Sequence, residues 1–205
     1  MSTTSSQTHL TLTKLALRRT IRAQRQALAA SDRDRAERAL AANALQLPRL
    51  RSATCVAVYA SLPDEPGTTA LRTALRERGT RVLLPVITDE TTLSWADDDG
   101  RVQPAGRLGV PEPLGRTGPP QRLGEADVIL VPALAVDTGG TRLGRGRGYY
   151  DRALALAKRD ALILAVVHDD EVLDGAATPI PREEHDVAVH GVLTPTRWMF
   201  FTPAA

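Results

Sequence analysis

Cysteine is nearly absent from this chain of 205 residues, which contains Cys55 and no other cysteine. One thiol cannot form an internal disulfide, and it cannot supply the several cysteines of a structural zinc site. Cys55 lies in an apolar run, so we expect a buried and unreactive thiol. A chain without disulfides is typical of a reducing compartment, and we therefore expect a cytoplasmic protein.

Long hydrophobic runs are also missing. No stretch approaches the roughly 18 apolar residues that a transmembrane helix needs, so we expect no membrane partner. Residues 1–9 are rich in Ser and Thr, and they lack the basic start and apolar centre of a secretory signal. We expect a flexible tail over residues 1–9 and a single domain over residues 10–205.

Aromatic residues make up only 3% of the chain, whereas hydrophobic residues of all kinds make up 42%. Aliphatic side chains must therefore fill most of the core. The shortage of aromatic rings also argues against a surface that stacks the bases of single-stranded nucleic acid. Lysine is scarce as well, because Lys14 and Lys158 are the only two and arginine supplies the remaining positive side chains.

The residues that are present predict alternating strands and helices. Helices are expected over residues 10–29, 31–47, 68–78 and 149–159. Strands are expected over residues 53–60, 81–87, 91–95, 126–132 and 161–167, with short extended segments at 187–193 and 197–201. This alternation is typical of an α/β fold, so we expect three layers, with a mostly parallel sheet between helices on both faces.

The first expected helix carries a basic stripe. Lys14, Arg18, Arg22 and Arg25 follow one another at spacings of four, four and three residues, which places them on one side of a helix. We expect Arg22 and Arg25 to be solvated surface residues. The pattern alone favours the same interpretation of Lys14.

A glycine-rich loop follows the strand expected at residues 126–132. Five of the 15 glycines lie between Gly139 and Gly148, interleaved with Arg142, Arg145 and Arg147. Glycines let a backbone approach a ligand closely, free amides at a helix start attract anions, and arginine forks bind oxyanions. The loop therefore predicts a phosphate or carboxylate site. It matches neither a Walker loop nor a dinucleotide fingerprint. The alternatives are a plain turn with solvated arginines and an Arg-Gly segment that binds nucleic acid.

The loop also resembles a known signature. Residues 142–151, RLGRGRGYYD, preceded by VPALA at residues 131–135, closely resemble the signature of the 5-formyltetrahydrofolate cyclo-ligase family. Shorter segments resemble other parts of that family in the same order. They are Lys14 with Arg18, Asp64 with Glu65, the segment GVPEP at residues 109–113, and His185 with Asp186.

The resemblance implies a ligase of one-carbon metabolism. Such an enzyme uses ATP and Mg²⁺ to convert 5-formyltetrahydrofolate to 5,10-methenyltetrahydrofolate, with release of ADP and phosphate. The γ-phosphoryl group activates the formyl oxygen, N10 of the folate attacks, and phosphate leaves. Phosphoryl transfer depends mainly on positioning and on charge neutralisation, which suits a loop rich in arginine and free amides.

The resemblance also implies a role for each matching residue. Those that contact ATP would be Lys14, Arg18, Arg142, Leu143, Gly144, Arg145, Gly146, Arg147, Gly148, Tyr149 and Tyr150. Those that contact the folate would be Glu65, Arg145, Gly146, Arg147, Gly148 and Tyr149. Arg145, Arg147 and Tyr150 would act in catalysis. Asp151 and Asp186 would hold Mg²⁺, which takes one or two carboxylates together with phosphates and waters.

Several of these residues have plainer interpretations. Asp151 suits the first turn of a helix electrostatically, Glu65 suits a loop, and Tyr150 suits a core. Two positions depart from the family pattern, since His190 and Gly67 stand where acidic residues are common, so metal binding by His190 is not expected. Trp95 and Trp198 are expected to pack in the interior, and His168 is expected to be structural.

Three hypotheses follow for the function. The first is an ATP-dependent folate cyclo-ligase, with 5-formyltetrahydrofolate (in its polyglutamylated form as well) and ATP as partners, no nucleic acid, and a monomeric chain. The second is a nucleic-acid-binding module built on the basic helices and the Arg-Gly run. The third is a protein that binds nucleotide or folate without turnover.

Overall fold

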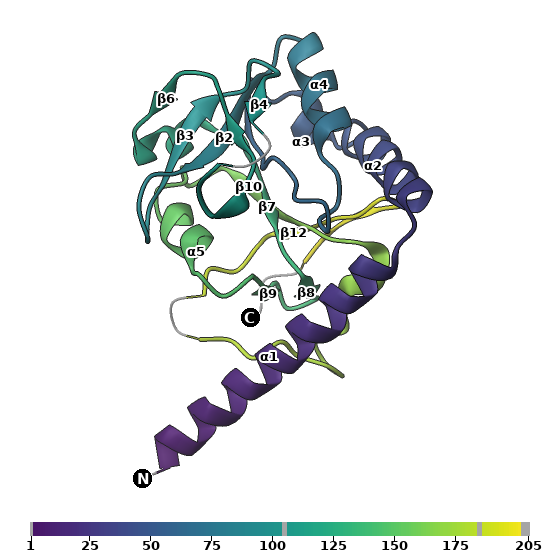
Figure 1. Cartoon of the computed structure of the whole chain (residues 1–205), viewed down its shortest axis with the longest axis vertical. Coiled ribbons are helices and arrows are strands. Elements are labelled where there is room, and N and C mark those ends of the chain that lie inside the picture. The colour runs from purple at the N-terminus through teal and green to yellow at the C-terminus, as the bar shows by residue number, and fades with distance from the viewer. Residues whose placement is uncertain (1, 104–105, 184–185, 202–205) are drawn as a thin grey trace.

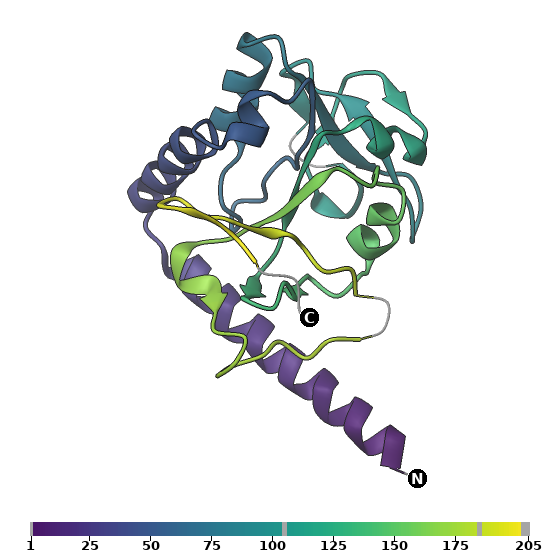
Figure 2. The same cartoon turned by 180° about the vertical axis from the view of Figure 1, so that it is seen from behind.

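The computed structural model describes the backbone of residues 2–103, 106–183 and 186–201, and the side chains of most residues from 14 onward. Its centre is an eight-stranded sheet, seen from two sides in Figures 1 and 2. The strands lie in the order β13 (Trp198–Phe200), β12 (Gly191–Leu193), β10 (Leu162–Val166), β7 (Val128–Pro132), β1 (Cys55–Ala57), β2 (Arg81–Ile87), β3 (Leu93–Asp97) and β6 (Thr117–Gly118). The five strands from β12 to β2 are parallel, and the outer pairs are antiparallel.

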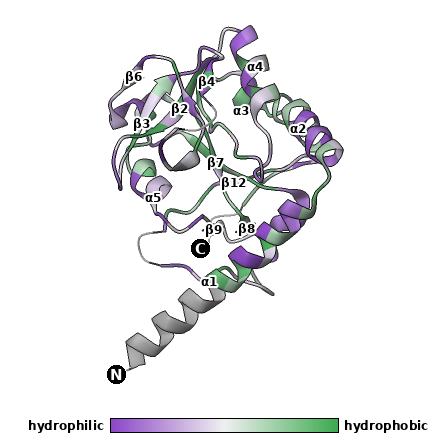
Figure 3. Ribbon diagram, in the orientation of Figure 1, coloured by the Kyte–Doolittle hydropathy of each residue, from purple (hydrophilic) through white to green (hydrophobic). Residues whose placement is uncertain are grey.

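Helices cover both faces of this sheet. On one face, α2 (Ala30–Ala44), α3 (Pro48–Arg51) and α4 (Thr69–Glu77) pack on the sheet through leucines such as Leu40 and Leu71. On the other face lie α5 (Tyr149–Leu154) and the 3-10 helix η2 (Pro120–Glu125). Hydrophobic residues predominate in the central strands (Figure 3), because both faces of these strands are buried.

A smaller sheet lies beyond the carboxyl ends of the central strands. Its order is β11 (Val172–Leu173), β8 (Ala135–Asp137) and β9 (Arg142–Leu143). Helix α1 (Ser2–Ala27) packs on this sheet through Ile21, which is buried with Leu134 and Leu143 (Figure 1). The basic side of α1 is thereby brought over the loop that follows β9.

The remaining short elements surround these two sheets. They are the hairpin of β4 (Val102–Gln103) and β5 (Glu112–Pro113), and the 3-10 helices η1 (Arg107–Gly109) and η3 (Asp169–Glu171). Helix η3 directly follows the end of β10. Among the described residues, no helix is both long and apolar enough to cross a bilayer.

The predicted fold class is confirmed, with three layers and a mostly parallel sheet. Cys55 is buried, as expected. Several boundaries were wrong. The strand expected at 53–60 is shorter, as β1 (Cys55–Ala57), the helix expected at 31–47 ends at Ala44, with α3 beginning beyond it, and the helix expected at 149–159 ends at Leu154. The strand expected at 91–95 is present as β3, shifted by two residues and antiparallel to β2. Helix α1 begins at Ser2, inside the expected tail, and the division into tail and domain stays a prediction.

Candidate active site

A cavity of about 570 Å³ lies where the carboxyl ends of β1, β2 and β7 meet α1 and the loop after β9. This edge of a parallel sheet is where α/β proteins bind ligands. The lining has a charged half and an apolar half. The charged half includes Lys14, Arg18, Arg22, Glu65, Arg142, Arg145, Arg147, Asp151, Glu183 and Asp186. The apolar half includes Tyr59, Pro85, Ile87, Leu93 and Val110.

The glycine-rich loop forms one wall of the cavity. Asp137 accepts hydrogen bonds from the backbone N–H groups of Gly139 and Thr141, at 3.1 and 2.9 Å, and so fixes the turn that leads into β9. Gly146 and Gly148 have φ angles of +97° and +66°, which side chains with a Cβ rarely adopt. Gly148 then caps the start of α5. The loop backbone therefore depends on glycine at these two positions.

Helix α1 supplies two cations to this wall. The Arg18 Nε donates to the backbone oxygen of Gly144 at 2.9 Å, which fastens the helix to the loop. Burial, together with the neighbouring Arg22, lowers the pKa of Arg18. The Lys14 Nζ is buried and lies 2.9 Å from Glu183 Oε1 and 3.1 Å from Asp186 Oδ2. Lys14 is therefore held in place by carboxylates inside the cavity.

Arg142 and the two proposed metal ligands lie together on the next side of the cavity. The Arg142 Nη2 lies 2.5 Å from Asp151 Oδ1, and its Nη1 donates to the backbone oxygen of Val187. The Val187 N–H donates to the same Asp151 oxygen at 3.2 Å. Because Asp186 directly precedes Val187, these bonds bring the two carboxylates into one region of the lining.

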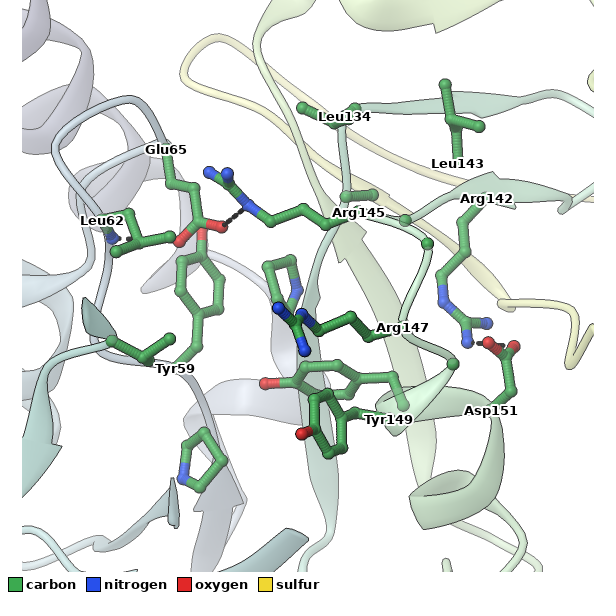
Figure 4. A pocket seen from close by; sticks show the side chains of 18 of the residues that line it. Tyr59, Leu62, Glu65, Leu134, Arg142, Leu143, Arg145, Arg147, Tyr149 and Asp151 are labelled. Carbon is green, nitrogen blue, oxygen red and sulfur yellow. Dashed lines mark hydrogen bonds and ion pairs between the residues drawn. The ribbon is translucent and has the colours of Figure 1, made fainter. Parts of the chain in front are cut away.

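Arg145 reaches across the cavity to the loop after β1 (Figure 4). It lies 2.6 Å from Asp64 Oδ1 and 3.0 Å from Glu65 Oε1. Although burial acts to lower it, the pKa of Arg145 is raised by Glu65 and Asp64. The other Glu65 oxygen accepts the N–H of Leu62 at 3.0 Å. The acidic pair is therefore oriented from its own loop and from the glycine-rich loop.

Tyrosines lie on the side of the cavity nearest the sheet. The Tyr149 hydroxyl donates to the backbone oxygen of Asp89 at 3.1 Å, and the Tyr59 hydroxyl donates to that of Pro66 at 2.9 Å. The Tyr150 hydroxyl is buried, yet no described residue bonds to it. Burial raises the pKa of Tyr150, followed in effect by the charge of Glu65. Tyr150 thus presents a protonated phenol that has no partner within the described chain.

The guanidinium of Arg147 points into the cavity in Figure 4. No described residue accepts a hydrogen bond from it. Its backbone oxygen instead accepts a bond from Arg152 at 2.9 Å. Together with Tyr150, Arg147 offers donor groups inside the cavity that the protein itself does not use.

The cavity gathers all the predicted site residues that the structure describes. His185 was predicted with Asp186 and lies outside the described residues. His190 is exposed outside the lining, where its Nδ1 accepts the N–H of Ile163 at 3.0 Å. Trp95 is buried in the core on the α5 face of the sheet, and Trp198 packs, partly buried, against the core on the α2 face. His168 is partly buried outside the lining.

The predicted solvation of the basic stripe was wrong. Arg25 is 2% exposed, and Arg22 is half-buried and lines the cavity. Sequence reasoning also missed the apolar half of the cavity and Glu183. The signal that could have indicated the apolar half was the position of Tyr59, which follows β1 at the carboxyl edge of the sheet. Since Arg142 and Arg145 are paired inside a cavity, the interpretation of this loop as a nucleic-acid-binding segment loses its basis.

Comparison with known proteins gives a consistent result. Residues 11–195 match the family described as the 5-formyltetrahydrofolate cyclo-ligase family. The chain is 45% identical over 151 residues to a 5-formyltetrahydrofolate cyclo-ligase of Mycolicibacterium smegmatis, covering 71% of this chain and 76% of the relative. It is 29% identical over 183 residues to the protein of that name from Haemophilus influenzae, covering 86% of this chain and 95% of the relative.

Solved structures agree with the sequence relatives. A 5,10-methenyltetrahydrofolate synthetase from Aquifex aeolicus superposes with a TM-score of 0.76 at 26% identity, over 94% of both chains. A synthetase from Mycoplasma pneumoniae superposes with a TM-score of 0.69 at 20% identity, over 89% of this chain and 98% of that one, which supports the fold alone.

Proposed function

Since the chain belongs to the 5-formyltetrahydrofolate cyclo-ligase family and converts 5-formyltetrahydrofolate to 5,10-methenyltetrahydrofolate, we propose that the cavity holds ATP and the folate side by side. The observation that supports this most is the lining itself. Cations from α1 and from the glycine-rich loop meet apolar groups from β2 and from the loop after β1 in one cavity. A polyanion and a flat, largely apolar ring system require those two surfaces together.

The charged half of the cavity is proposed to bind the nucleotide phosphates. Lys14 and Arg18 would approach from α1, and Arg142 and Arg147 from the loop, with the loop amides of residues 143–149 as further donors. Lys14 is already desolvated by the protein, so its charge would act on a phosphate with little screening. When the nucleotide binds, Lys14 would leave the carboxylates of Glu183 and Asp186 and contact phosphate oxygens instead.

The apolar half is proposed to bind the pterin and benzoyl rings of the folate. Tyr59, Ile87 and Leu93 offer flat or aliphatic contacts there. Glu65 is held by Arg145 and by the Leu62 N–H, so its carboxylate is already oriented. A carboxylate suits the paired N–H groups of an aminopyrimidine ring, with which it forms charge-assisted hydrogen bonds.

The proposed chemistry begins with attack of the formyl oxygen on the γ-phosphorus, which releases ADP. N10 of the folate then attacks the activated formyl carbon and loses its proton, the ring closes, and phosphate departs with the formyl oxygen. Arg145 and Arg147 would stabilise the charge on the transferred group. Tyr150 is protonated at neutral pH, and burial raises its pKa further, so it would donate a hydrogen bond to an oxygen of the reacting centre.

Asp151 and Asp186 are proposed to hold Mg²⁺. Their donor set fits this ion, since two carboxylates in the lining of one cavity leave the other positions to phosphate oxygens and waters. The bound ion would neutralise part of the triphosphate charge. Before nucleotide binds, the same two carboxylates are neutralised by Arg142 and Lys14. Cytoplasmic location, a monomeric state and acceptance of polyglutamylated folate stay predictions.

The test follows the formyl oxygen. The protein would be mixed with ATP, Mg²⁺ and 5-formyltetrahydrofolate that carries ¹⁸O in the formyl group, and the methenyl product would be followed by absorbance. We expect product to appear only with ATP, with one ADP for each product and ¹⁸O in the released phosphate. Unlabelled phosphate, or product formed without ATP, would overturn the proposed mechanism.

A further inference from the structure

Arg25 forms a buried ion pair with Glu171 that belongs to none of the roles above. The guanidinium Nε lies 2.6 Å from Glu171 Oε1, and Nη2 lies 2.7 Å from Oε2. Arg25 is 2% exposed and Glu171 4% exposed, so both charges are withheld from water. Neither residue lines the cavity. Burial of two charges is costly and is weak support for stability, so the pair calls for another explanation.

The other bonds of this pair connect the loops at the carboxyl ends of three neighbouring strands. Arg25 Nη1 donates to the backbone oxygen of Asp64 at 3.2 Å, in the loop after β1. Arg25 Nη2 donates to the backbone oxygen of Ala133 at 2.7 Å, directly after β7. Glu171 accepts the N–H of His168 at 2.7 Å, directly after β10. Because β10, β7 and β1 are adjacent in the sheet, the Arg25–Glu171 pair connects the segments that follow three successive strands.

The same pair also fixes the rotation of α1. Lys14, Arg18, Ile21 and Arg25 are separated by four, three and four residues, so they lie on one side of the helix. Arg25 and Ile21 are buried against the protein body, and this places Lys14 and Arg18 toward the cavity.

We propose that Arg25, with Glu171, is a positioning pair that holds the Asp64–Glu65 loop in the geometry that binds the folate. The inference rests on the placement of the folate against Glu65 in the proposed function. Arg25 contacts the backbone of Asp64, whose side chain and neighbour both bind Arg145. The pair therefore acts on the substrate through the loop rather than by contact.

The experiment separates positioning from stability. In the double variant Arg25→Met with Glu171→Met, both buried charges are replaced by apolar side chains of similar length, an exchange that often preserves stability. The chain offers a matched control. Arg72 and Asp98 form another buried two-bond pair, at 2.8 and 3.0 Å, outside the cavity lining. The control is Arg72→Met with Asp98→Leu.

For Arg25→Met with Glu171→Met we expect the KM for 5-formyltetrahydrofolate to rise about tenfold, because small displacements of a binding group are costly. We expect faster amide hydrogen exchange in residues 61–67, measured without substrate. The control pair should change neither quantity by more than about twofold. Both quantities unchanged in a folded Arg25 and Glu171 variant would overturn the proposal. A wild-type protein that lacks ATP-dependent turnover would overturn the proposed function instead.

A single variant keeps the test decisive if the double variant does not fold. Arg25→Lys retains the positive charge beside Glu171 but lacks the planar fork that reaches Asp64 and Ala133 together. We expect this variant to fold, with a raised KM for the folate and faster exchange in residues 61–67. A folded Arg25→Lys protein with wild-type KM and exchange would contradict the proposal.

Discussion

The two ends of the central sheet carry ion pairs of different kinds. At the amino ends of the strands, Arg81 pairs with Glu125 with side chains 48% and 39% exposed. At the carboxyl ends, Lys14 pairs with Asp186 at 8% and 16% exposed. Arg25 and Glu171, also at the carboxyl ends, are buried almost completely. Opposite charges are thus common at both ends, and buried pairs are not confined to the carboxyl ends, since Arg72 and Asp98 near the start of β2 have side chains 7% and 0% exposed.

Burial together with a position in the cavity lining or beside it indicates which charges are arranged for a ligand. Exposed pairs are screened by water and salt and are worth about 0–1 kcal/mol each. Desolvated pairs cost more to form, and they are worth keeping where a ligand exchanges with one partner or where a loop must be held. Lys14 and Arg142 fit the first case, and Arg25 fits the second.

Arg145 gives the largest expected contrast between the two ends. We expect Arg145→Ala to lower kcat/KM by about 100-fold or more, because it removes a charged donor from the reacting centre and releases Glu65. The fold should persist, since Arg145 lies in a loop outside the core. Turnover is followed by absorbance of the methenyl product, and folding by circular dichroism.

The matched control for Arg145 is Arg81→Ala at the amino ends. It also breaks an arginine–carboxylate pair, and we expect activity within about twofold of the wild type. Near-normal activity of Arg145→Ala, or equal losses in both variants, would remove the distinction between the two ends.

Tyr150 and Tyr59 sharpen the comparison within the carboxyl end. We expect Tyr150→Phe to lower kcat by about 10-fold or more while the melting temperature stays unchanged, because its hydroxyl has no partner among the described residues. Tyr59→Phe should show the reverse and lose about 1 kcal/mol of stability, since its hydroxyl donates to Pro66. A wild-type kcat for Tyr150→Phe would exclude the catalytic role of the phenol.

Substitution of Lys14 is expected to have a moderate effect that is confined to the binding of ATP. We expect Lys14→Met to raise the KM for ATP by about tenfold, because one charge that contacts phosphate is lost. The KM for the folate should change little, since Lys14 lies on the side of Glu183 and Asp186. Initial rates with each substrate varied in turn provide the measurement, and a rise confined to the folate KM would contradict the placement of ATP.

Substitution of Asp127 is expected to have the smallest effect of these variants, and to change stability but not activity. Burial acts to raise its pKa, but hydrogen bonds from Lys158, Cys55 and Thr54 hold that pKa well below its usual range. A carboxyl whose pKa is lowered in the folded state stabilises it above the unfolded pKa of about 3.9 and loses that effect as pH falls toward the folded value. We expect Asp127→Asn to lower the urea midpoint at pH 7 and to approach the wild type at low pH, with activity unchanged. An equal deficit at both pH values would contradict this assignment.

The sequence predicted the layers and the loop because those depend on local patterns. Continuous apolar strands and glycines at residues 139–148 are visible without the fold. The boundaries were less accessible. The helix expected from residue 31 begins as α2 at Ala30, after Ala29 and with no side-chain cap. The strand at β3 lies antiparallel at one side of the sheet, a pairing that no local pattern encodes.

The pairing of charges could not be predicted, because the partners are distant in sequence. Arg25 meets Glu171 across 146 residues, and Lys14 meets Asp186 across 172. A basic stripe on a helix ordinarily faces water, so the burial of Arg25 can be recognised only from the tertiary structure. The apolar half of the cavity was missed for the same reason, since Tyr59 and Leu93 come together only when the strands assemble.

The central claim is that the cavity at the carboxyl ends binds ATP against α1 and the glycine-rich loop. A crystal structure with a non-hydrolysable ATP analogue and Mg²⁺ tests it most directly. We expect phosphate oxygens in contact with Lys14 and the amides of residues 143–149, and Mg²⁺ on Asp151 and Asp186. A nucleotide bound elsewhere, with Lys14 still paired to Glu183 and Asp186, would contradict the claim.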